Sequence, residues 1–189
     1  MFDHHEFNSI ISDTIKNKII TYIDLLKTYN ETTNIYSKKS YDKLPYHIYD
    51  SIQLAQQIQT TPLTVDMGSG SGLPGIIISI CNPNPIICIE SKLKKRTFLS
   101  LVKHTLNLDN LTVFEGDVQA FAKIHSKQKI TAFTAKAFAK PPLLMKYLSM
   151  FKKHQLSPTT TCWVPISLDQ KNELESIIPC TTKTFANQS

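Results

Sequence analysis

The sequence predicts an α/β fold in which a doubly wound, mostly parallel sheet follows an N-terminal helical extension. From residue 63 onward, five short apolar or β-branched runs alternate with stretches long enough for helices, which is typical of parallel strands joined by helical crossovers. The first 60 residues instead show helical spacing of apolar side chains. The 189 residues, 41% hydrophobic and 19% charged, suit a globular chain with a buried core. We expect the extension over residues 1–60 and one globular domain over 61–189.

The extension is expected to contain two helices. Over residues 8–30, isoleucines and a leucine recur at helical spacing with polar residues between them, which predicts an amphipathic helix. A polar loop follows, and a second helical stretch covers residues 44–59. The "TTP" at residues 60–62 ends this stretch, because proline cannot continue a helix. The helices need an apolar surface on which to pack.

The domain is expected to alternate strands and helices. The predicted strands are LTVDM (63–67), IICIE (86–90), LTVFE (111–115), ITAFTA (130–135) and TTCWVPI (160–166). The predicted crossover helices are 72–81, 92–107, 118–126, 141–154 and 167–177. In such sheets ligands bind outside the carboxyl ends of the strands. Four polar residues at those ends are therefore candidate site residues: Asp66, Glu90, Asp117 and Lys136.

The stretch "VDMGSGSGLPGI", residues 65–76, holds four of the five glycines. Glycines allow positive φ and close approach of a ligand, and Pro74 suits the first turn of a helix. Read from Gly70, the stretch matches GxGxxG with Glu90 20 residues further on, which indicates a dinucleotide. Read from Asp66, it is D-x-G-x-G-x-G, the loop that binds S-adenosylmethionine (SAM) in many enzymes. A carboxylate repels a pyrophosphate and attracts the two cationic groups of SAM, so SAM is favoured and NAD(P) is the alternative.

Two further acids follow the second and third strands. Glu90 is placed to accept the ribose hydroxyls of a nucleoside cofactor, and Asp117, in "FEGDV", to accept the adenine amino group. The alternative is that both are ordinary acids at helix N-termini, where they stabilise the helix dipole.

The net charge of +6 suggests an anionic partner, with nucleic acid as the first candidate. Arg96 is the one arginine among 21 basic residues, and lysine attracts phosphate without the planar fork that reads base edges. The charge therefore favours backbone contacts over base reading. The candidate phosphate contacts are Lys38, Lys39, Lys94, Lys95 and Arg96. The alternative is a solvated helix face.

Metal and membrane sites are not expected. The four cysteines show no CxxC spacing and the six histidines no HExxH pattern. The longest apolar run is far too short to span a bilayer, and the N-terminus lacks the features of a signal peptide. We expect a cytoplasmic, monomeric protein without a metal site.

Residues 22–175 resemble the RsmG family, the 16S rRNA guanine-N7 methyltransferases, also called glucose-inhibited division protein B. "LLKTYNETTNI" is similar to a helix end of that family with two spaced asparagines, and "YHIYDS" to its H-I-x-D-S segment. "VDMGSGSGLPGI" is nearly its D-x-G-[ST]-G-x-G-L-P-G-I, where L-P-G separates the family from other SAM loops. "IESKLKKRTFL" and "TAKAFAKP" resemble two further segments.

The resemblance implies a Rossmann-like class I methyltransferase that uses SAM and acts on 16S rRNA or an assembling small ribosomal subunit. The residues it assigns to cofactor binding are Asp66, Gly68, Ser69, Gly70, Gly72, Leu73, Pro74, Glu90, Ser91, Asp117, Val118 and Lys136. Guanine N7 carries no proton, so no certain catalytic residue is expected. The positioning candidates are His47, Asp50 and Lys136; for His47 and Asp50 the alternative is a packing role.

Several positions depart from the family pattern. Lys136 and Tyr46 stand where the family has arginines, "WVPIS" where members have a lysine–glycine pair, and the sequence stops at "CTTKTFANQS", short of the final β-hairpin that the resemblance implies. Three other functions stay open: a SAM-dependent methyltransferase of another substrate, an NAD(P)-binding oxidoreductase, and a non-catalytic ribosome-binding relative.

Overall fold

A five-stranded parallel sheet forms the middle layer of the molecule. The computed structural model describes residues 11–125 and 129–164. The strands are β1 (Thr64–Met67), β2 (Ile86–Glu90), β3 (Leu111–Glu115), β4 (Ile130–Thr134) and β5 (Leu156–Trp163). Their order is β3-β2-β1-β4-β5, and every neighbouring pair is parallel. The predicted doubly wound sheet is confirmed, and the order reverses between β1 and β4, where such sheets bind ligands.

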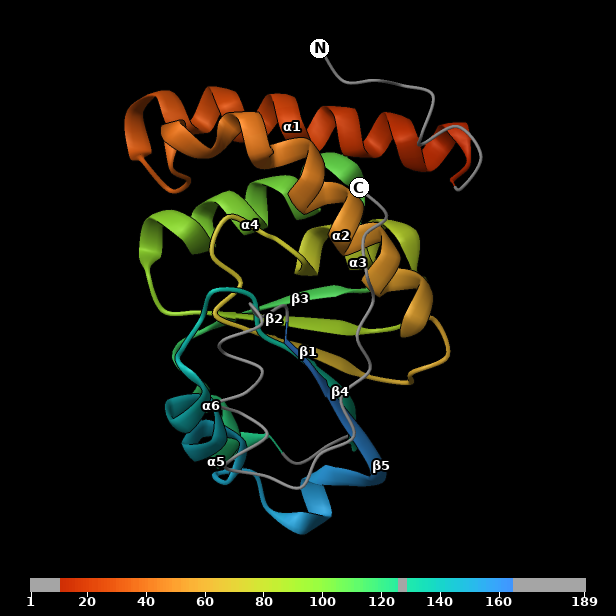
Figure 1. Ribbon diagram of the computed structural model, residues 1–189, viewed down its shortest axis with the longest axis vertical. Coiled ribbons are helices and arrows are strands. Elements are labelled where there is room, and N and C mark those ends of the chain that lie inside the picture. Colours follow the sequence, from red (N-terminus) through yellow and green to blue (C-terminus); the bar gives the residue numbers. More distant parts are fainter. Residues whose placement is uncertain (1–10, 126–128, 165–189) are drawn as a thin grey trace.

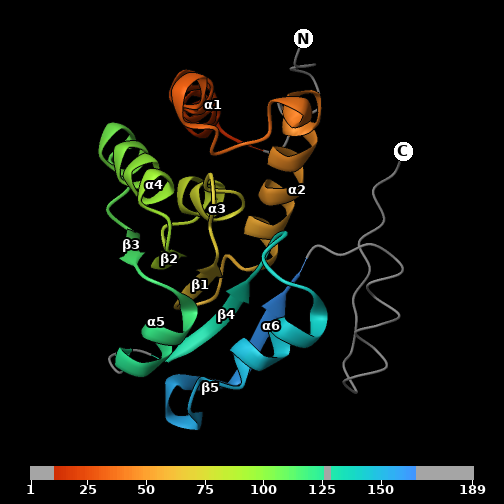
Figure 2. The same cartoon turned by 90° about the vertical axis from the view of Figure 1, so that its left-hand side faces the viewer.

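Helices cover both faces of the sheet (Figures 1 and 2). They are α1 (Asp13–Thr33), the 3-10 helix η1 (Lys38–Lys43), α2 (Leu44–Gln57), α3 (Gly75–Cys81), α4 (Leu93–Leu106), α5 (Val118–Ile124), α6 (Pro141–Leu148) and the 3-10 helix η2 (Lys153–Gln155). α3 and α4 lie on one face, and α5 and α6 on the other. α1 and α2 form an outer layer, α1 against α4 and α2 against α3. The expected helix over 167–177 lies outside the described residues.

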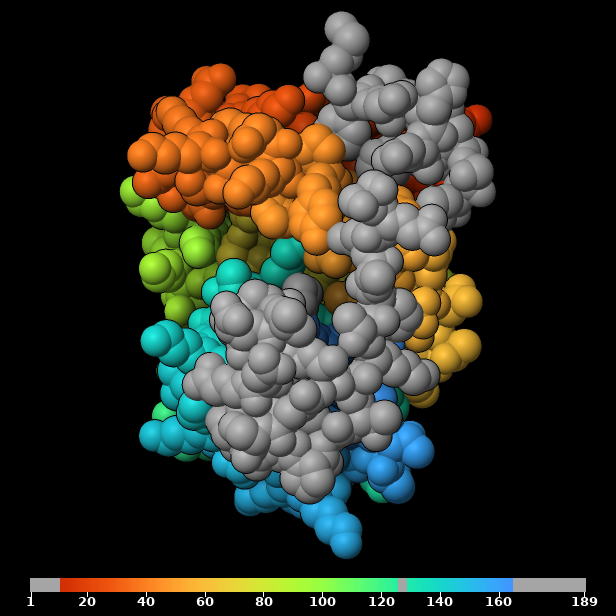
Figure 3. Space-filling model, in the orientation of Figure 1, coloured from red at the N-terminus to blue at the C-terminus, as the bar shows by residue number. Residues whose placement is uncertain are grey.

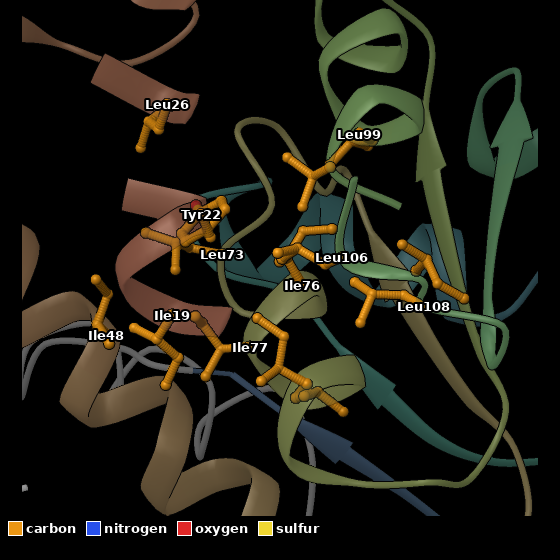
Figure 4. Packing of buried hydrophobic residues seen from close by; sticks show 14 of the residues in the cluster. Ile19, Tyr22, Leu26, Ile48, Leu73, Ile76, Ile77, Leu99, Leu106 and Leu108 are labelled. Atoms are coloured by element: carbon orange, nitrogen blue, oxygen red, sulfur yellow. The ribbon is translucent and has the colours of Figure 1, made fainter. Parts of the chain in front are cut away.

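Two apolar cores lie on the two faces because alternate strand residues point in opposite directions. The first core joins α1 and α2 to α3, α4 and the sheet, and Figure 4 shows Tyr22 of α1 near Leu73 and Leu99 of α4 within it. The second core lies under α5 and α6 and takes Val65 and Met67 from β1. The apolar face expected of the N-terminal helices therefore packs on the domain itself. No described helix is both long and apolar enough to cross a membrane.

The segment after α6 differs from the expected helix over 141–154. The helix ends at Leu148, and Phe151 turns inward to lie 4.8 Å from Phe133, between ring centroids. Gln155 then accepts a hydrogen bond from the Lys152 backbone N–H at 2.6 Å and donates to a carbonyl of α5. A turn and the 3-10 helix η2 therefore stand where the sequence predicted a continued α-helix. β5 consequently begins at residue 156, ahead of the predicted 160.

Candidate functional site

The glycine loop, residues 68–72, joins β1 to α3 at the carboxyl edge of the sheet. Its three glycines have φ angles of 70°, 59° and 101°. Hydrogen bonds fix the loop from three directions: the Ser69 backbone N–H donates to Ile89 O at 3.0 Å, the Ser69 hydroxyl donates to Asp66 O at 3.1 Å, and the buried Tyr22 hydroxyl of α1 donates to Ser71 O at 2.9 Å. The N-terminal extension thus takes part directly in shaping this loop.

Gly68 needs to be glycine for two reasons. Its φ of 70° is a left-handed conformation that other residues rarely adopt. A Cβ at this position would also collide with the ring of Phe138, which follows β4 and rests on the glycine. Ala137, the residue before Phe138, also has a left-handed backbone conformation, with a φ of 51°. The loop after β4 and the glycine loop are therefore in van der Waals contact across the switch point.

Asp66 lies beneath the loop with 1% of its surface exposed. Its Oδ1 accepts a hydrogen bond from the Thr134 hydroxyl at 2.7 Å, and its Oδ2 is buried without a hydrogen-bond partner among the described residues. The side chain points toward α3, where a Cβ on Gly75 would stand 2.6 Å from Oδ2. Burial raises the pKa of Asp66 to about 6, against the hydrogen bond from Thr134. This carboxylate is a concentrated negative charge at the end of β1.

Glu90, at the end of β2, holds the glycine loop from the other side. Its Oε2 accepts from the Gly70 backbone N–H and its Oε1 from the Lys92 backbone N–H, both at 2.9 Å. The residue is 6% exposed. Each carboxylate oxygen can accept a second hydrogen bond, so Glu90 can hold the loop and still accept from a ligand hydroxyl.

Three further expected residues, Ser91 after β2 and Asp117 and Val118 after β3, differ in their exposure. Asp117 caps α5 by accepting from the Ala120 backbone N–H at 2.7 Å, as the alternative interpretation proposed, while the side chain itself is exposed. Val118 is buried in the second core. Ser91 is exposed, and its carbonyl accepts from Arg96 at 2.8 Å. Arg96 also reaches Glu115 at 3.7 Å, which turns it toward β3.

Lys136 links the loop after β4 to α2. Its Nζ lies 2.7 Å from Asp50 Oδ2 and donates to His47 O at 3.4 Å. The Nδ1 atom of His47 is buried without a hydrogen-bond partner among the described residues. Burial, and next the charge of Lys136, lower the pKa of His47. The three predicted positioning residues are thus brought together, although their functional role stays a prediction.

A lysine pocket opens beside the glycine loop. We give this name to a cavity of about 510 Å³ between the segment after α1 and the start of α4, lined by Asn34, Ile35, Tyr36, Ser37, Lys38, Lys39, Lys92 and Lys95. In Figures 1 and 3 the orange segment after α1 borders the green start of α4 here. The predicted phosphate contacts divide: Lys38, Lys39 and Lys95 line the pocket, whereas Lys94 and Arg96 do not.

Sequence reasoning missed Thr134, Phe138 and Lys92. Thr134 pairs in register with Asp66 across β4 and β1, and a polar residue at the end of a buried strand was its available signal. Phe138 and Lys92 carry no such signal, because their roles arise from contacts between segments far apart in the chain. Leu73 and Pro74, predicted to bind a cofactor, are buried, Leu73 within the first core. No cluster of three or more possible metal ligands occurs within residues 11–125 and 129–164.

The parallel strand order and the glycine loop at its switch point are those of the class I methyltransferase fold. An SAH-bound methyltransferase of Podospora anserina superposes with a TM-score of 0.57 at 10% identity, covering 86% of this chain and 70% of that one. The family described as rRNA small subunit methyltransferase G (GidB) matches residues 15–159. The chain belongs to this family.

Individual relatives agree with the family match. A ribosomal RNA small subunit methyltransferase G of Neisseria meningitidis serogroup C is 34% identical over 131 residues, which are 68% of this chain and 61% of the relative. The protein of the same name from Klebsiella pneumoniae strain 342 is 37% identical over 113 residues, 59% of this chain and 54% of the relative. The match therefore spans less than two thirds of the length of these relatives.

Proposed function

We propose that this chain is a SAM-dependent methyltransferase that methylates N7 of a guanine in small-subunit (16S) rRNA. The observation that carries the proposal is the pair of buried carboxylates, Asp66 and Glu90, on either side of a left-handed glycine loop at the switch point of the sheet. The substrate is inferred from the family, whose members are named for small-subunit rRNA methylation.

The charge of the site supports SAM over a dinucleotide. The Asp66 carboxylate repels a pyrophosphate, and a cation close to its Oδ2 relieves the cost of burying that oxygen. Glu90 is the acceptor for the ribose hydroxyls. The solved structural relative from Podospora anserina holds SAH, the demethylated form of this cofactor. The remaining proposed contacts are Gly68, Ser69, Gly70, Gly72, Leu73, Pro74, Ser91, Asp117, Val118 and Lys136.

The reaction requires the protein to position the two reactants relative to each other. Bound in this site, SAM would supply a methyl group carried on a sulfonium. The guanine N7 atom offers a lone pair and bears no proton, so no side chain has to remove one. The residues of this chain bind and orient the two reactants, which can contribute ~7–11 kcal/mol in favourable cases. We assign His47, Asp50 and Lys136 to positioning, because their contacts fix the loop after β4 against α2.

The two parts of the chain have different tasks in this proposal. The domain from residue 61 holds the cofactor, and the helical extension before it shapes the glycine loop through Tyr22 and carries Lys38 and Lys39 toward RNA. The protein acts as a monomer in the cytoplasm, where small ribosomal subunits are assembled, and an assembly intermediate is the proposed substrate.

Mapping of N7-methylguanine in small-subunit rRNA, with and without this protein, tests the proposal. We expect one guanine to gain the modification only when the active protein and SAM are present. Calorimetry with SAM and with NADH adds a second measurement. We expect SAM to bind and NADH not to bind. NADH binding would support an oxidoreductase, SAM binding with methylation elsewhere another substrate, and ribosome binding without methylation a non-catalytic relative. Each of these three results would overturn the proposal.

A further inference from the structure

The lysine pocket brings four positive charges together without an acid among its lining residues. Lys38 and Lys39 come from η1, and Lys92 and Lys95 from the start of α4, so the charges belong to segments more than fifty residues apart. Like charges held close together destabilise the folded state unless a counter-charge binds. Two acids interact with lining residues without lining the pocket themselves: Glu90 accepts from the Lys92 backbone N–H at 2.9 Å, and Asp42 contributes to the raised pKa of Tyr36 after burial, its largest cause.

The wall after α1 is held in place by a buried amide. Asn30 is 0% exposed, and its side chain donates to Tyr36 O and to the Tyr41 hydroxyl at 2.7 Å and accepts from the Tyr36 backbone N–H at 3.0 Å. The rings of Tyr36 and Tyr41 stack with centroids 5.6 Å apart. Asn34 ends α1 with a φ of 51°. These contacts preorganise the segment that carries Lys38 and Lys39.

The wall at α4 is fixed to the extension. The Tyr29 hydroxyl of α1 donates to Lys94 O at 3.0 Å, and its ring lies 5.2 Å from that of Phe98, between centroids. The first turn of α4 holds no acid and follows the lysine N-cap Lys92. A helix N-terminus favours negative groups over positive ones. Stability of the helix alone does not explain these lysines, whereas an anion bound between the two walls does.

The pocket adjoins the cofactor loop. Lys95 Nζ lies 3.8 Å from the place where a Cβ on Gly70 would stand, so one lysine borders both the pocket and the glycine loop. We propose that the lysine pocket binds phosphate groups of the RNA backbone next to the nucleotide that is methylated. This inference rests on the proposed function and names the contact that brings the RNA to the methyl donor. Lysines suit this task because they neutralise phosphates without reading base edges.

Neutralisation of two exposed lysines tests the proposal. We expect the double variant Lys38→Gln/Lys39→Gln to bind small-subunit rRNA on the order of tenfold more weakly, with the slope of log affinity against log salt reduced by about 1.5, since each lost phosphate contact removes ~0.7–0.9. Its affinity for SAH is expected to stay within about twofold. The matched control is Lys152→Gln/Lys153→Gln, an exposed neighbouring pair before β5, which removes the same charge and is expected to leave both affinities nearly unchanged.

The outcomes separate the pocket from the proposed function. Equal losses of RNA affinity in the two double variants would overturn the proposal that the lysine pocket binds RNA, since RNA affinity would then depend only on net charge. A Lys38→Gln/Lys39→Gln variant that binds RNA as the parent does would also overturn it. Binding of inorganic tripolyphosphate that depends on Lys38 and Lys39, with an unchanged RNA salt slope, would assign the pocket to a free phosphate compound and exclude the RNA backbone. A parent protein that binds and methylates no rRNA would refute the proposed function and this inference with it.

Discussion

The glycine loop and the lysine pocket meet at Lys95 but are built by opposite means. The loop is lined by acids, and its buried carboxylates are held by Thr134 and by backbone N–H groups. The pocket is lined by lysines, three of them exposed, and its shape depends on the buried amide of Asn30. In both regions the groups that carry charge are held by hydrogen bonds from uncharged partners: the Thr134 hydroxyl and backbone N–H groups hold the carboxylates, and the Asn30 amide holds the backbone segment that carries Lys38 and Lys39.

Under the proposed function and the proposed phosphate site, each region binds a different ligand. The acid-lined loop suits a cationic cofactor and the lysine pocket a polyanion, because each region has the opposite charge to its proposed ligand. Variants in one region should then change the affinity for one ligand and leave the other affinity nearly unaltered.

The largest expected effect is that of Gly68→Ala. A left-handed conformation costs a non-glycine residue roughly 1–2 kcal/mol, and the new methyl group must also displace the ring of Phe138. We expect SAH affinity to fall at least about tenfold, as 1.4 kcal/mol corresponds to a factor of ten, while RNA affinity stays within about twofold. Titration calorimetry and RNA binding at fixed salt measure both.

The double variant Gly68→Ala/Phe138→Ala sharpens this result, with Phe138→Ala alone as the control. Removal of the ring leaves the backbone strain but relieves the collision, so part of the lost SAH affinity should return. An equal loss of SAH and RNA affinity in Gly68→Ala would contradict the separation of the two regions, because a local change in the loop would then have altered the whole protein.

The loop could be predicted from the sequence, whereas its partners could not. Glycine spacing and Asp66 identify the loop because both lie within a dozen consecutive residues. The strands and their parallel pairing followed from alternating patterns in the same way. Phe138 reaches Gly68 only through the pairing of β4 with β1, which no local pattern encodes. The end of α6 was misplaced for a similar reason, since burial of Phe151 depends on Phe133 in another strand.

The lysine pocket was predicted in part. The sequence marked Lys38, Lys39 and Lys95 by charge alone, and by the same reasoning also Lys94 and Arg96. Orientation separates these residues: Arg96 turns to Glu115 and to the Ser91 carbonyl, and Lys94 lies outside the pocket lining. The direction of a long side chain depends on its three-dimensional neighbours, so composition cannot determine it.

A second prediction concerns the buried charge of Asp66. Its pKa rises from 3.8 to about 6 in the folded protein, so the folded state binds the proton more tightly than the unfolded chain and loses stability as the pH rises through this window. At ~1.4 kcal/mol per pKa unit the whole shift is worth about 3 kcal/mol, and about a third of it is already lost at pH 4.5. Relative to Asp66→Asn, the parent should therefore lose about 2 kcal/mol of unfolding free energy between pH 4.5 and 7.5. Urea unfolding at the two pH values measures this difference.

The same variant distinguishes the two regions by ligand. Asp66→Asn should bind SAM on the order of tenfold more weakly, because the attraction between this carboxylate and the cationic groups of SAM is removed, and should bind RNA as well as the parent. Asp109→Asn, an exposed acid before β3, is the control and should change neither quantity. If SAM affinity is preserved in Asp66→Asn, the carboxylate has no part in cofactor binding.

The smallest effect is expected at His47, which lies in neither region. Burial and the charge of Lys136 lower its pKa, so the imidazole is neutral near pH 7 and its buried Nδ1 could in principle accept a proton. Guanine N7 has no proton to give, and loss of a true general base costs ~10²–10⁴ in rate. We therefore expect His47→Asn to retain turnover within about tenfold, with a single-turnover rate in the parent that is nearly flat from about pH 6.5 to 8.5, above the ordinary histidine pKa near 6.5.

His104→Asn, at an exposed position on α4, controls for the loss of a histidine as such and should behave like the parent. Asp66→Asn, by contrast, should act through cofactor affinity and be partly rescued by excess SAM, which separates a binding role from a chemical one. Complete loss of turnover in His47→Asn with both ligands still bound, together with a steep ionisation near neutrality in the parent, would reveal a proton transfer. The methyl acceptor would then have to be a different atom, such as a ring or exocyclic nitrogen that must lose a proton, and the positioning role of His47 would give way to that of a base.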